Sequence, residues 1–277
     1  MKPDDFEAHM RKGEWFHSLR VPEGVWFVIR LDGRGFTKLT QDMGFKKPFD
    51  TALHDYMART VEKCMEDFQG VFATTHSDEI SILFRPDADF FDREVEKIVS
   101  TTAAVASARF TQVLGDPGTF DSRIWLGASI GDVCDYFSWR MEDSVRGCIN
   151  SYAYWMLRQQ KGATQGQATR ELIRKNFAWK NEFLFKEFGL NFNDIPVWQR
   201  RGTGFHFSLV EKMGYNPIKN EEVRTTRRVL RHEFEMPMKE RFRTWLSTNL
   251  RLILDYPELR GTFHMLSENL EEKSKEV

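Results

Sequence analysis

The stretch Val25-Trp26-Phe27-Val28-Ile29-Arg30-Leu31-Asp32 decides the fold of this chain. It is apolar at nearly every position, which predicts a buried strand in the middle of a sheet rather than at its edge. Asp32 ends the strand, and the glycine-containing sequence Gly33-Arg34-Gly35 follows directly. We therefore expect a carboxylate to be presented at the end of a central strand.

A second acidic pair, Asp78-Glu79, lies between two further apolar runs at 71–75 and 80–84. The runs predict two strands with the acids near the tip that joins them. Carboxylates at a strand end and at a hairpin tip can converge across neighbouring strands. Converging carboxylates bind Mg²⁺, and Mg²⁺ binds phosphates. This is the arrangement of a polymerase or cyclase palm.

The remainder of the N-terminal half predicts two helices and a fourth strand. Asp50 is expected to cap a helix over 51–69 that ends at Gly70. A helix over about 89–114 and a strand over 123–130 complete the order β-α-β-β-α-β. That order is the ferredoxin-like arrangement and the core of a palm domain. The predicted fold class is therefore α+β.

From about residue 133 the sequence predicts additional helices and a short C-terminal strand and helix region. Asp135 is expected to cap a helix to about Gln160, and a capping box at Thr164 opens the next helix. The later expected elements are a helix over 179–188, a strand over 201–210 and a helix over 238–254.

The basic residues are concentrated in the second half of the chain. The whole chain has a net charge of −1, but residues 170–251 hold 17 Lys and Arg against 10 Asp and Glu. A basic region beside an acidic metal site suits a large polyanionic substrate. We expect a palm-like catalytic core over 1–134 and a helical, basic region over 135–277 that completes the site, the two forming one compact unit.

Several classes of protein are excluded by composition. The three cysteines form no Cys-x-x-Cys pair and no His-Glu-x-x-His sequence occurs, which argues against a disulfide framework or a zinc site and fits a cytoplasmic protein. The N-terminus lacks the apolar core of a signal peptide, and no apolar stretch of about 18 residues predicts a membrane span.

The predicted site is a two-metal centre for nucleotidyl transfer. Asp32 and Asp78 are the bridging candidates, the Gly33 carbonyl is a neutral ligand, and Glu79 is either a third ligand or an orienting acid. Backbone N–H groups of the Gly33–Phe36 turn can face a triphosphate. Lys47, near Asp50, and Ser77 are placed to contact the same phosphates. On the helix to Gln160, a polar stripe is either a solvated face or the wall of a substrate groove; it consists of Asp143, Arg146 and Asn150.

The chain resembles the tRNA(His) guanylyltransferase superfamily of 3′-to-5′ RNA polymerases over roughly residues 20–210. The motifs that carry the resemblance occur in the family's order. They are Arg30-Leu31-Asp32-Gly33-Arg34-Gly35-Phe36, Lys47-Pro48-Phe49-Asp50, His76-Ser77-Asp78-Glu79, Tyr136-Phe137-Ser138-Trp139-Arg140, Lys180-Asn181-Glu182 and Arg200-Arg201-Gly202-Thr203.

The resemblance implies a nucleotidyltransferase that uses two Mg²⁺ ions and takes ATP, GTP or other nucleoside triphosphates. In that reaction the 3′-hydroxyl of an incoming nucleotide attacks the α-phosphate of a tRNA 5′ end that carries a triphosphate or an adenylyl group. It also implies a homotetramer. The residues it assigns to triphosphate binding are Gly33, Arg34, Gly35, Phe36, Thr37, Lys47, Asp50, Ser77 and Lys97. Those assigned to the tRNA groove are Arg140, Asp143, Arg146, Asn150, Lys180, Asn191, Arg200 and Arg201.

One departure separates this chain from the eukaryotic enzymes. Val145 stands where those enzymes carry a histidine, and Met141 replaces a glutamine. Arg146 and Asn150 resemble instead the bacterial and archaeal guanylyltransferase-like proteins, which are associated with template-directed repair of 5′-truncated tRNA. We expect repair to be the activity. The alternatives are a dedicated tRNA(His) guanylyltransferase, a nucleotidyl cyclase and a non-catalytic RNA-binding protein.

Overall fold

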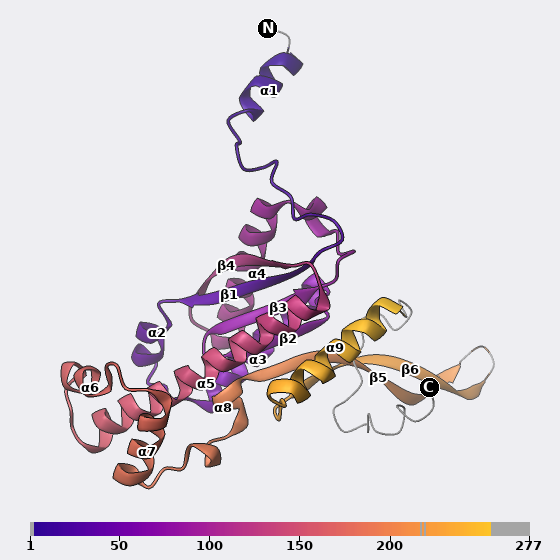
Figure 1. The fold of residues 1–277 in the computed structure, drawn as a ribbon. Coiled ribbons are helices and arrows are strands. Elements are labelled where there is room, and N and C mark those ends of the chain that lie inside the picture. Colours follow the sequence, from indigo (N-terminus) through magenta and orange to yellow (C-terminus); the bar gives the residue numbers. More distant parts are fainter. Residues whose placement is uncertain (1–2, 217, 219, 256–277) are drawn as a thin grey trace.

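The computed structural model describes residues 3–216, 218 and 220–255, and a six-stranded antiparallel sheet forms its centre (Figure 1). The strand order is β4-β1-β3-β2-β5-β6. The strands are β1 (Trp26–Arg34), β2 (Phe72–His76), β3 (Glu79–Phe84), β4 (Thr119–Gly127), β5 (Thr203–Asn216) and β6 (Glu221–Glu233). The three strands predicted around Asp32 and Asp78 are therefore neighbours, as the palm arrangement requires.

Two helices cover one face of the first four strands. They are α3 (Thr51–Phe68) and α4 (Val95–Leu114), and their apolar side chains pack on residues of β1 and β3 such as Ile29, Leu31 and Ile82. These three side chains have no exposed surface, so solvent is excluded from this part of the core. The strand order β4-β1-β3-β2 with two helices on one face is the ferredoxin-like core, so the predicted fold class is confirmed.

The opposite face of the sheet is covered by α5 (Ile130–Gln160) and α9 (Lys239–Asp255), which lie across it in Figure 1. They pack on Val28, Phe72 and Leu83. Since side chains alternate along a strand, Arg30 and Asp32 point to the same face as Val28. The far half of α5 extends past the sheet and packs with smaller helices. These are α6 (Gln165–Leu172), α7 (Phe177–Phe188), η2 (Phe192–Asp194) and α8 (Val197–Arg201).

The second half of the chain contributes more strand than predicted. The expected strand over 201–210 is β5, which continues to Asn216 and pairs with β6 along its whole length in a long ribbon. The predicted C-terminal strand and helix region is present, but its strand part is longer than expected, because β6 is mostly charged and polar and gives no apolar alternation from which to predict it. β5 also pairs with β2, which joins both halves in one sheet. The division at 134/135 stays a prediction, and part of 135–277 lies outside the described residues.

Element boundaries shift where side chains cap the backbone differently from the prediction. Asp50 caps α3 as predicted, but the helix ends at Gln69 in the left-handed conformation rather than at Gly70. Ser129, in a capping box with Asp132, begins α5. Asp135 lies inside this helix and pairs with Arg243 of α9, so its predicted capping role is wrong.

Two elements beside β1 also begin elsewhere than expected. The residues before α4 form a short helical turn, η1 (Phe90–Arg93), so α4 starts at Val95 and not near 89. Strand β4 covers Thr119–Gly127 rather than 123–130, since it pairs from Arg34 back to Trp26 of β1. The predicted capping box at Thr164 and the end of α7 at Gly189 are confirmed.

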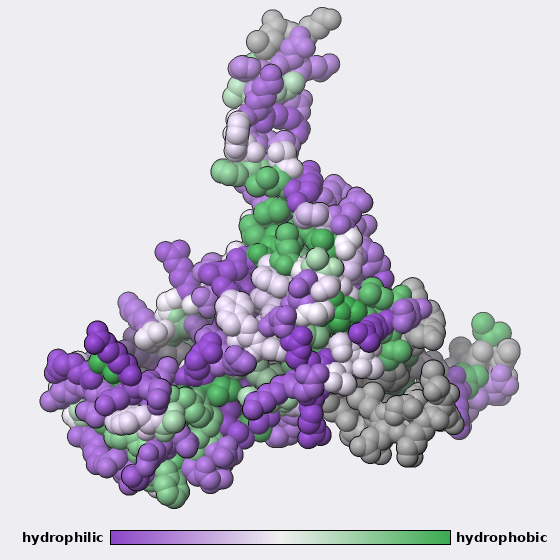
Figure 2. All heavy atoms as spheres, viewed as in Figure 1, coloured by the Kyte–Doolittle hydropathy of each residue, from purple (hydrophilic) through white to green (hydrophobic). Residues whose placement is uncertain are grey.

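An N-terminal arm projects away from the body of the molecule (Figures 1 and 2). Its helix is α1 (Pro3–Arg11), which the sequence reading did not predict. The segment between α1 and β1 exposes large apolar side chains, namely Trp15, Phe16 and Leu19. In the described ranges, none of the helices is long and apolar enough to span a bilayer.

Candidate active site

Backbone pairing brings the three predicted acids to one end of the sheet. Asp32 of β1 is directly opposite Glu79 of β3. The Gly33 N–H donates to the carbonyl oxygen of Asp78 at 3.0 Å. The structure therefore unites Asp32, Asp78 and Glu79, although two segments more than 40 residues apart supply them.

Asp78 is a partly buried acid that makes no ion pair with a described residue. Burial, together with the nearby Asp32, raises the pKa of its carboxyl, and the Ser77 hydroxyl donates to it and opposes the rise. Ser77 occupies the left-handed region with φ 55°, which turns the chain at the strand tip. Among the described residues, neither Asp32 nor Asp78 makes an ion pair. The local electrostatics thus favour a cation beside Asp78.

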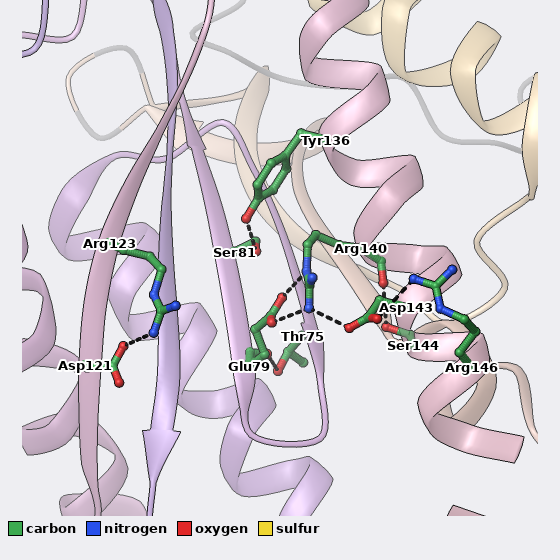
Figure 3. A network of polar contacts seen from close by, with 10 residues as sticks. All are labelled: Thr75, Glu79, Ser81, Asp121, Arg123, Tyr136, Arg140, Asp143, Ser144 and Arg146. Carbon is green, nitrogen blue, oxygen red and sulfur yellow. Dashed lines mark hydrogen bonds and ion pairs between the residues drawn. The ribbon is translucent and has the colours of Figure 1, made fainter. Parts of the chain in front are cut away.

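Glu79 differs from the other two acids because Arg140 of α5 holds it (Figure 3). The guanidinium donates to both carboxylate oxygens, at 2.8 and 2.5 Å. Burial raises the pKa of Glu79, and Arg140 acts in the opposite direction. Arg140 also donates to Asp143 at 3.1 Å, and Asp143 accepts from Arg146 at 3.1 Å. Glu79 is therefore an anchored acid, and its predicted role in orienting the site stays a prediction.

A pocket of about 220 Å³ lies beside Asp78, between the loop before α3, the β2 tip, α5 and α8. Lys47 extends into it, and its ammonium donates to the Thr40 hydroxyl at 2.5 Å. Burial lowers the pKa of Lys47, while Asp78 and Asp50 oppose that effect. The ammonium lies 5.9 Å from the centre of the Trp155 ring. Aromatic surface and a lysine in one pocket suit a nucleotide with its phosphates.

The turn after β1 forms one wall of this pocket and depends on two glycines. A Cβ at Gly33 would lie 2.5 Å from the Phe36 ring and 2.8 Å from the Asp78 Cβ, so only glycine fits there. Gly35 has φ +76° and precedes α2 (Phe36–Asp42), which carries Thr37 at the pocket. The Phe36 ring itself is buried in the core, so only its backbone remains available for the predicted triphosphate contact. Arg34 is exposed at the end of β1.

Asp50 has a structural role in addition to its place in the pocket wall. Its carboxylate accepts from the backbone N–H groups of Ala52 and Leu53 at the start of α3 and from that of Lys46 at 2.8 Å. These hydrogen bonds outweigh burial, so the pKa of Asp50 is lowered. Asp50 therefore fixes the loop that carries Lys47.

A second cavity of about 230 Å³ adjoins the first and contains the acids. Its walls include Asp32, Glu79, Arg140 and Asp143, and it shares Asp78 with the first pocket. Two ligands can thus approach Asp78 from different cavities. This is the geometry that a transfer between two substrates needs.

Sequence reasoning missed four aromatic and imidazole side chains of the pocket. His76 is partly buried and donates through Nε2 to the Gln199 carbonyl at 2.8 Å, and burial lowers its pKa to about 4. His54 contacts the Thr203 hydroxyl at 2.9 Å and lies against the Trp198 ring. Trp155 and Trp198 complete the set. His76 could have been predicted as a site residue, because it belongs to the motif His76-Ser77-Asp78-Glu79. The sequence around Trp155 and Trp198 gives no comparable indication.

Most residues predicted to contact tRNA make contacts within the protein. Lys180 donates to Asn150 at 2.7 Å. Arg200 donates to the Ile195 carbonyl at 2.7 Å, and Arg201 to the Met236 carbonyl at 2.8 Å. Asn191 caps η2. Their role in binding RNA stays a prediction, and part of their hydrogen-bonding capacity is already used.

Lys97 is not brought to this cluster. It lies in the first turn of α4 and pairs with Glu94 at 3.1 Å. The other end of α4 leads into β4 opposite Arg34, which places Lys97 about 25 Å of helix away from the acids. The predicted phosphate contact of Lys97 is therefore not made within one copy of the chain.

The residues present fit a bound Mg²⁺ ion. No group of three or more His, Cys, Asp or Glu side chains in the described part of the chain is arranged as a metal cluster. Mg²⁺ does not need one, since it commonly binds one or two carboxylates together with substrate phosphates and water. Asp32 and Asp78 offer such a pair beside the Gly33 backbone, and both lack a cationic partner among the described residues.

A ferredoxin-like palm with unpaired acids at a strand end beside a pocket with a lysine defines the class of palm nucleotidyltransferases. Family models agree: the model described as tRNAHis guanylyltransferase matches residues 7–127, and the Thg1 C terminal domain matches 131–243. The chain belongs to the tRNA(His) guanylyltransferase family, whose members are nucleotidyltransferases.

Individual relatives support the same assignment. The chain is 33% identical over 209 residues to a probable tRNA(His) guanylyltransferase of Mus musculus, covering 72% of this chain and 68% of that protein. It is 33% identical over 230 residues to the tRNA(His) guanylyltransferase of Neurospora crassa, covering 76% and 78%.

Solved structures share the fold. A bacterial tRNA(His) guanylyltransferase-like protein in complex with ATP has a TM-score of 0.69 at 24% identity, covering 88% of this chain and 98% of that chain. The same kind of protein in complex with GTP has a TM-score of 0.64 at 24% identity, covering 89% and 99%. The enzyme from Saccharomyces cerevisiae gives 0.64 at 21% identity, covering 70% and 90%.

Proposed function

We propose that this chain adds a nucleotide to the 5′ end of a tRNA, in the 3′-to-5′ direction. The observation that carries the proposal is the pair Asp32 and Asp78: the Gly33 N–H next to Asp32 donates to the Asp78 carbonyl, and Asp78 lies where the two cavities meet. The curated relatives are named tRNA(His) guanylyltransferases, which favours addition of G to tRNA(His) as the first candidate.

The proposed step joins two nucleotides at the α-phosphate of the activated 5′ end. The 3′-hydroxyl of the incoming nucleotide loses its proton and forms a bond to that phosphorus, and pyrophosphate or AMP leaves with the bonding electron pair. Asp32, Asp78 and the Gly33 carbonyl would hold Mg²⁺, which neutralises phosphate charge when bound. Lys47 contacts phosphate oxygens, and Arg140 keeps Glu79 in place.

Template-directed repair of 5′-truncated tRNA is the second candidate. Val145 occupies the helix position at which the family resemblance implies a histidine in the eukaryotic enzymes. Val145 packs in the apolar cluster of α5 and α7, so no imidazole is available there to read a tRNA-specific feature. In repair, pairing with the opposing base would select the nucleotide.

The deciding experiment supplies each labelled nucleoside triphosphate with tRNA(His) that lacks its extra G and with tRNAs that lack the first 5′ nucleotide and differ in the opposing base. Addition of G to tRNA(His) alone supports the first candidate. Incorporation that follows the opposing base supports repair. A cyclic nucleotide formed without RNA would show a cyclase instead, and RNA binding with no incorporation would show a non-catalytic protein.

Mg²⁺, a cytoplasmic location and a homotetramer are further parts of the proposal. Analytical ultracentrifugation of the full chain would test the tetramer. Incorporation assayed after chelation and after return of Mg²⁺ would test the metal.

A further inference from the structure

A strip of flat and cationic side chains lies on the α5 face of the sheet, next to the acids. We define the Trp139 strip as Trp139, Arg30 and Arg123. Arg30 of β1 is directly opposite Arg123 of β4, and the next pair on the same face is Asp32 opposite Asp121. Two residues along a strand span about 7 Å, so the strip begins beside the site. None of its three members lines either cavity at Asp78.

Arg30 is a partly buried cation on the face of β1 that also carries Asp32. Its guanidinium makes no hydrogen bond or ion pair with any described residue, and its contact is with the Trp139 ring, 5.7 Å from the ring centre. Like charges directly opposite each other in a sheet are destabilising. Arg123 is only partly compensated by Asp121 at 2.8 Å, since both side chains are about half exposed (Figure 3). Arg30 also acts electrostatically on Glu79, and Arg123 on Asp32 and Glu79, so the two guanidinium groups lie at the edge of the acidic site.

Trp139 exposes 47% of its surface although it follows a buried stretch of α5. Its ring lies 5.9 Å from that of Tyr136 and 4.6 Å from the guanidinium of Arg140. An exposed indole between arginines is the combination that stacks on nucleobases and binds their phosphates.

We propose that the Trp139 strip binds the 5′-terminal nucleotides of the RNA substrate, with a base on Trp139 and phosphates on Arg30 and Arg123. The inference rests on the proposed function, because it assigns that reaction's second substrate to this side of the acids. The pocket with Lys47 takes the free nucleotide, and the strip brings the RNA end to Asp78 from β1 and β4. The two substrates therefore reach the acids from different sides.

The test compares Trp139→Ala, Trp139→Phe and Arg123→Gln with two matched controls in the full chain. Trp15→Ala removes a tryptophan that is 79% exposed on the N-terminal arm. Arg85→Gln removes an arginine that, like Arg123, pairs with an aspartate two residues away. For each protein we would measure the Kd for a tRNA lacking its first 5′ nucleotide over a salt series, the KM for the nucleoside triphosphate and the melting temperature.

Loss of one stacked base predicts that Trp139→Ala weakens RNA binding about 5- to 150-fold, with Trp139→Phe retaining most of the affinity. Arg123→Gln should lower the slope of log Kd against log salt by about one. The KM for the free nucleotide and both controls should stay at wild-type values. Because Trp139→Phe and Arg123→Gln are mild changes, they keep the test valid if Trp139→Ala melts early.

RNA affinity in Trp139→Ala within about twofold of wild type would overturn the inference. An equal rise in the KM for free nucleotide would also overturn it, since the strip would then serve the other substrate. Failure of the proposed function has a different signature: the wild-type protein itself would neither bind the tRNA nor add a nucleotide to it.

Discussion

Arg140 holds Glu79 by both carboxylate oxygens, at 2.8 and 2.5 Å, and thereby links α5 to β3, the strand that begins directly after Asp78. The pair is mostly buried, with side chains 15% and 21% exposed. A helix that covers one face of the sheet is thus coupled directly to the acidic end of that sheet. The ion pair therefore fixes the position of Glu79, which lies directly opposite Asp32 in the pairing of β1 with β3.

Breaking that ion pair should destabilise the protein. Arg140→Gln leaves the Glu79 carboxylate buried without its cation, and we expect the free energy of unfolding to fall by about 1–3 kcal/mol. The double variant Glu79→Gln/Arg140→Gln removes the orphaned charge and should recover part of the loss. Urea unfolding of the wild type and these two variants measures this. A double variant no more stable than Arg140→Gln would show that the charge is not the cause.

The pH dependence of nucleotide addition should report Asp78. Burial raises the pKa of Asp78 above that of an ordinary carboxyl. As the pH is lowered, activity should therefore begin to fall at a higher pH than an ordinary carboxyl would give. Lys47 favours the charged carboxylate, and Lys47→Gln should therefore move the acidic limb of the rate profile to higher pH. Lys38→Gln, an exposed lysine on α2, is the control. An acidic limb that does not move in Lys47→Gln would refute the coupling.

His76 should make the protein less stable as the pH falls. A carboxyl group with a raised pKa, such as that of Asp78, has the opposite effect. Its pKa is about 4 in the folded protein and about 6.5 unfolded, so the unfolded chain takes up the proton first as the pH falls. The contribution of neutral His76 is complete above pH 6.5 and is lost toward pH 4, a change of about 3 kcal/mol.

The measurement is the stability of wild type and His76→Gln in urea at several pH values from 7 to 4. Carboxylates titrate in both proteins and cancel in the difference. The destabilising effect of His76→Gln should therefore shrink as the pH is lowered. A difference that stays constant over this range would contradict the buried, neutral histidine.

Gly33→Ala should damage the site through sterics alone. The added Cβ would lie 2.5 Å from the Phe36 ring and 2.8 Å from the Asp78 Cβ. Overpacking of this kind costs about 1–3 kcal/mol of stability, and moving Asp78 should also reduce nucleotide addition. Gly147→Ala on α5 is the stability control, since nothing lies within 4 Å of its added Cβ. Unchanged stability and activity in Gly33→Ala would mean that the turn can relax.

The core strands could be predicted from the sequence because burial determines them. β1 and β3 are apolar where they face α3 and α4, and that pattern is visible locally. β6 could not be predicted in this way, because its strand conformation comes from pairing with β5 rather than from burial. The start of α5 was misplaced for a related reason: Ser129 and Asp135 are both good capping residues, and only the tertiary contact of Asp135 with Arg243 separates them.

The acids of the site could be predicted, whereas most of the pocket around them could not. Asp32 and Asp78 interrupt apolar runs, and an acid at such a place is conspicuous. Trp198 and His54 meet across 144 positions of the chain, and no local pattern encodes that contact. Lys97 shows the opposite limit of sequence motifs: its place in the motif does not bring it near the acids within one copy of the chain, and its phosphate contact stays a prediction.

The measurement that tests the central claim most directly is incorporation of labelled nucleotide into a 5′-truncated tRNA by wild type, Asp32→Asn and Asp78→Asn. The substitutions keep the size of each side chain and remove its charge, and circular dichroism and melting temperature confirm that each variant is folded. If these carboxylates hold the phosphates through a cation, the wild type incorporates nucleotide and both folded variants lose at least about 100-fold in rate. Near wild-type incorporation by either folded variant would contradict the account.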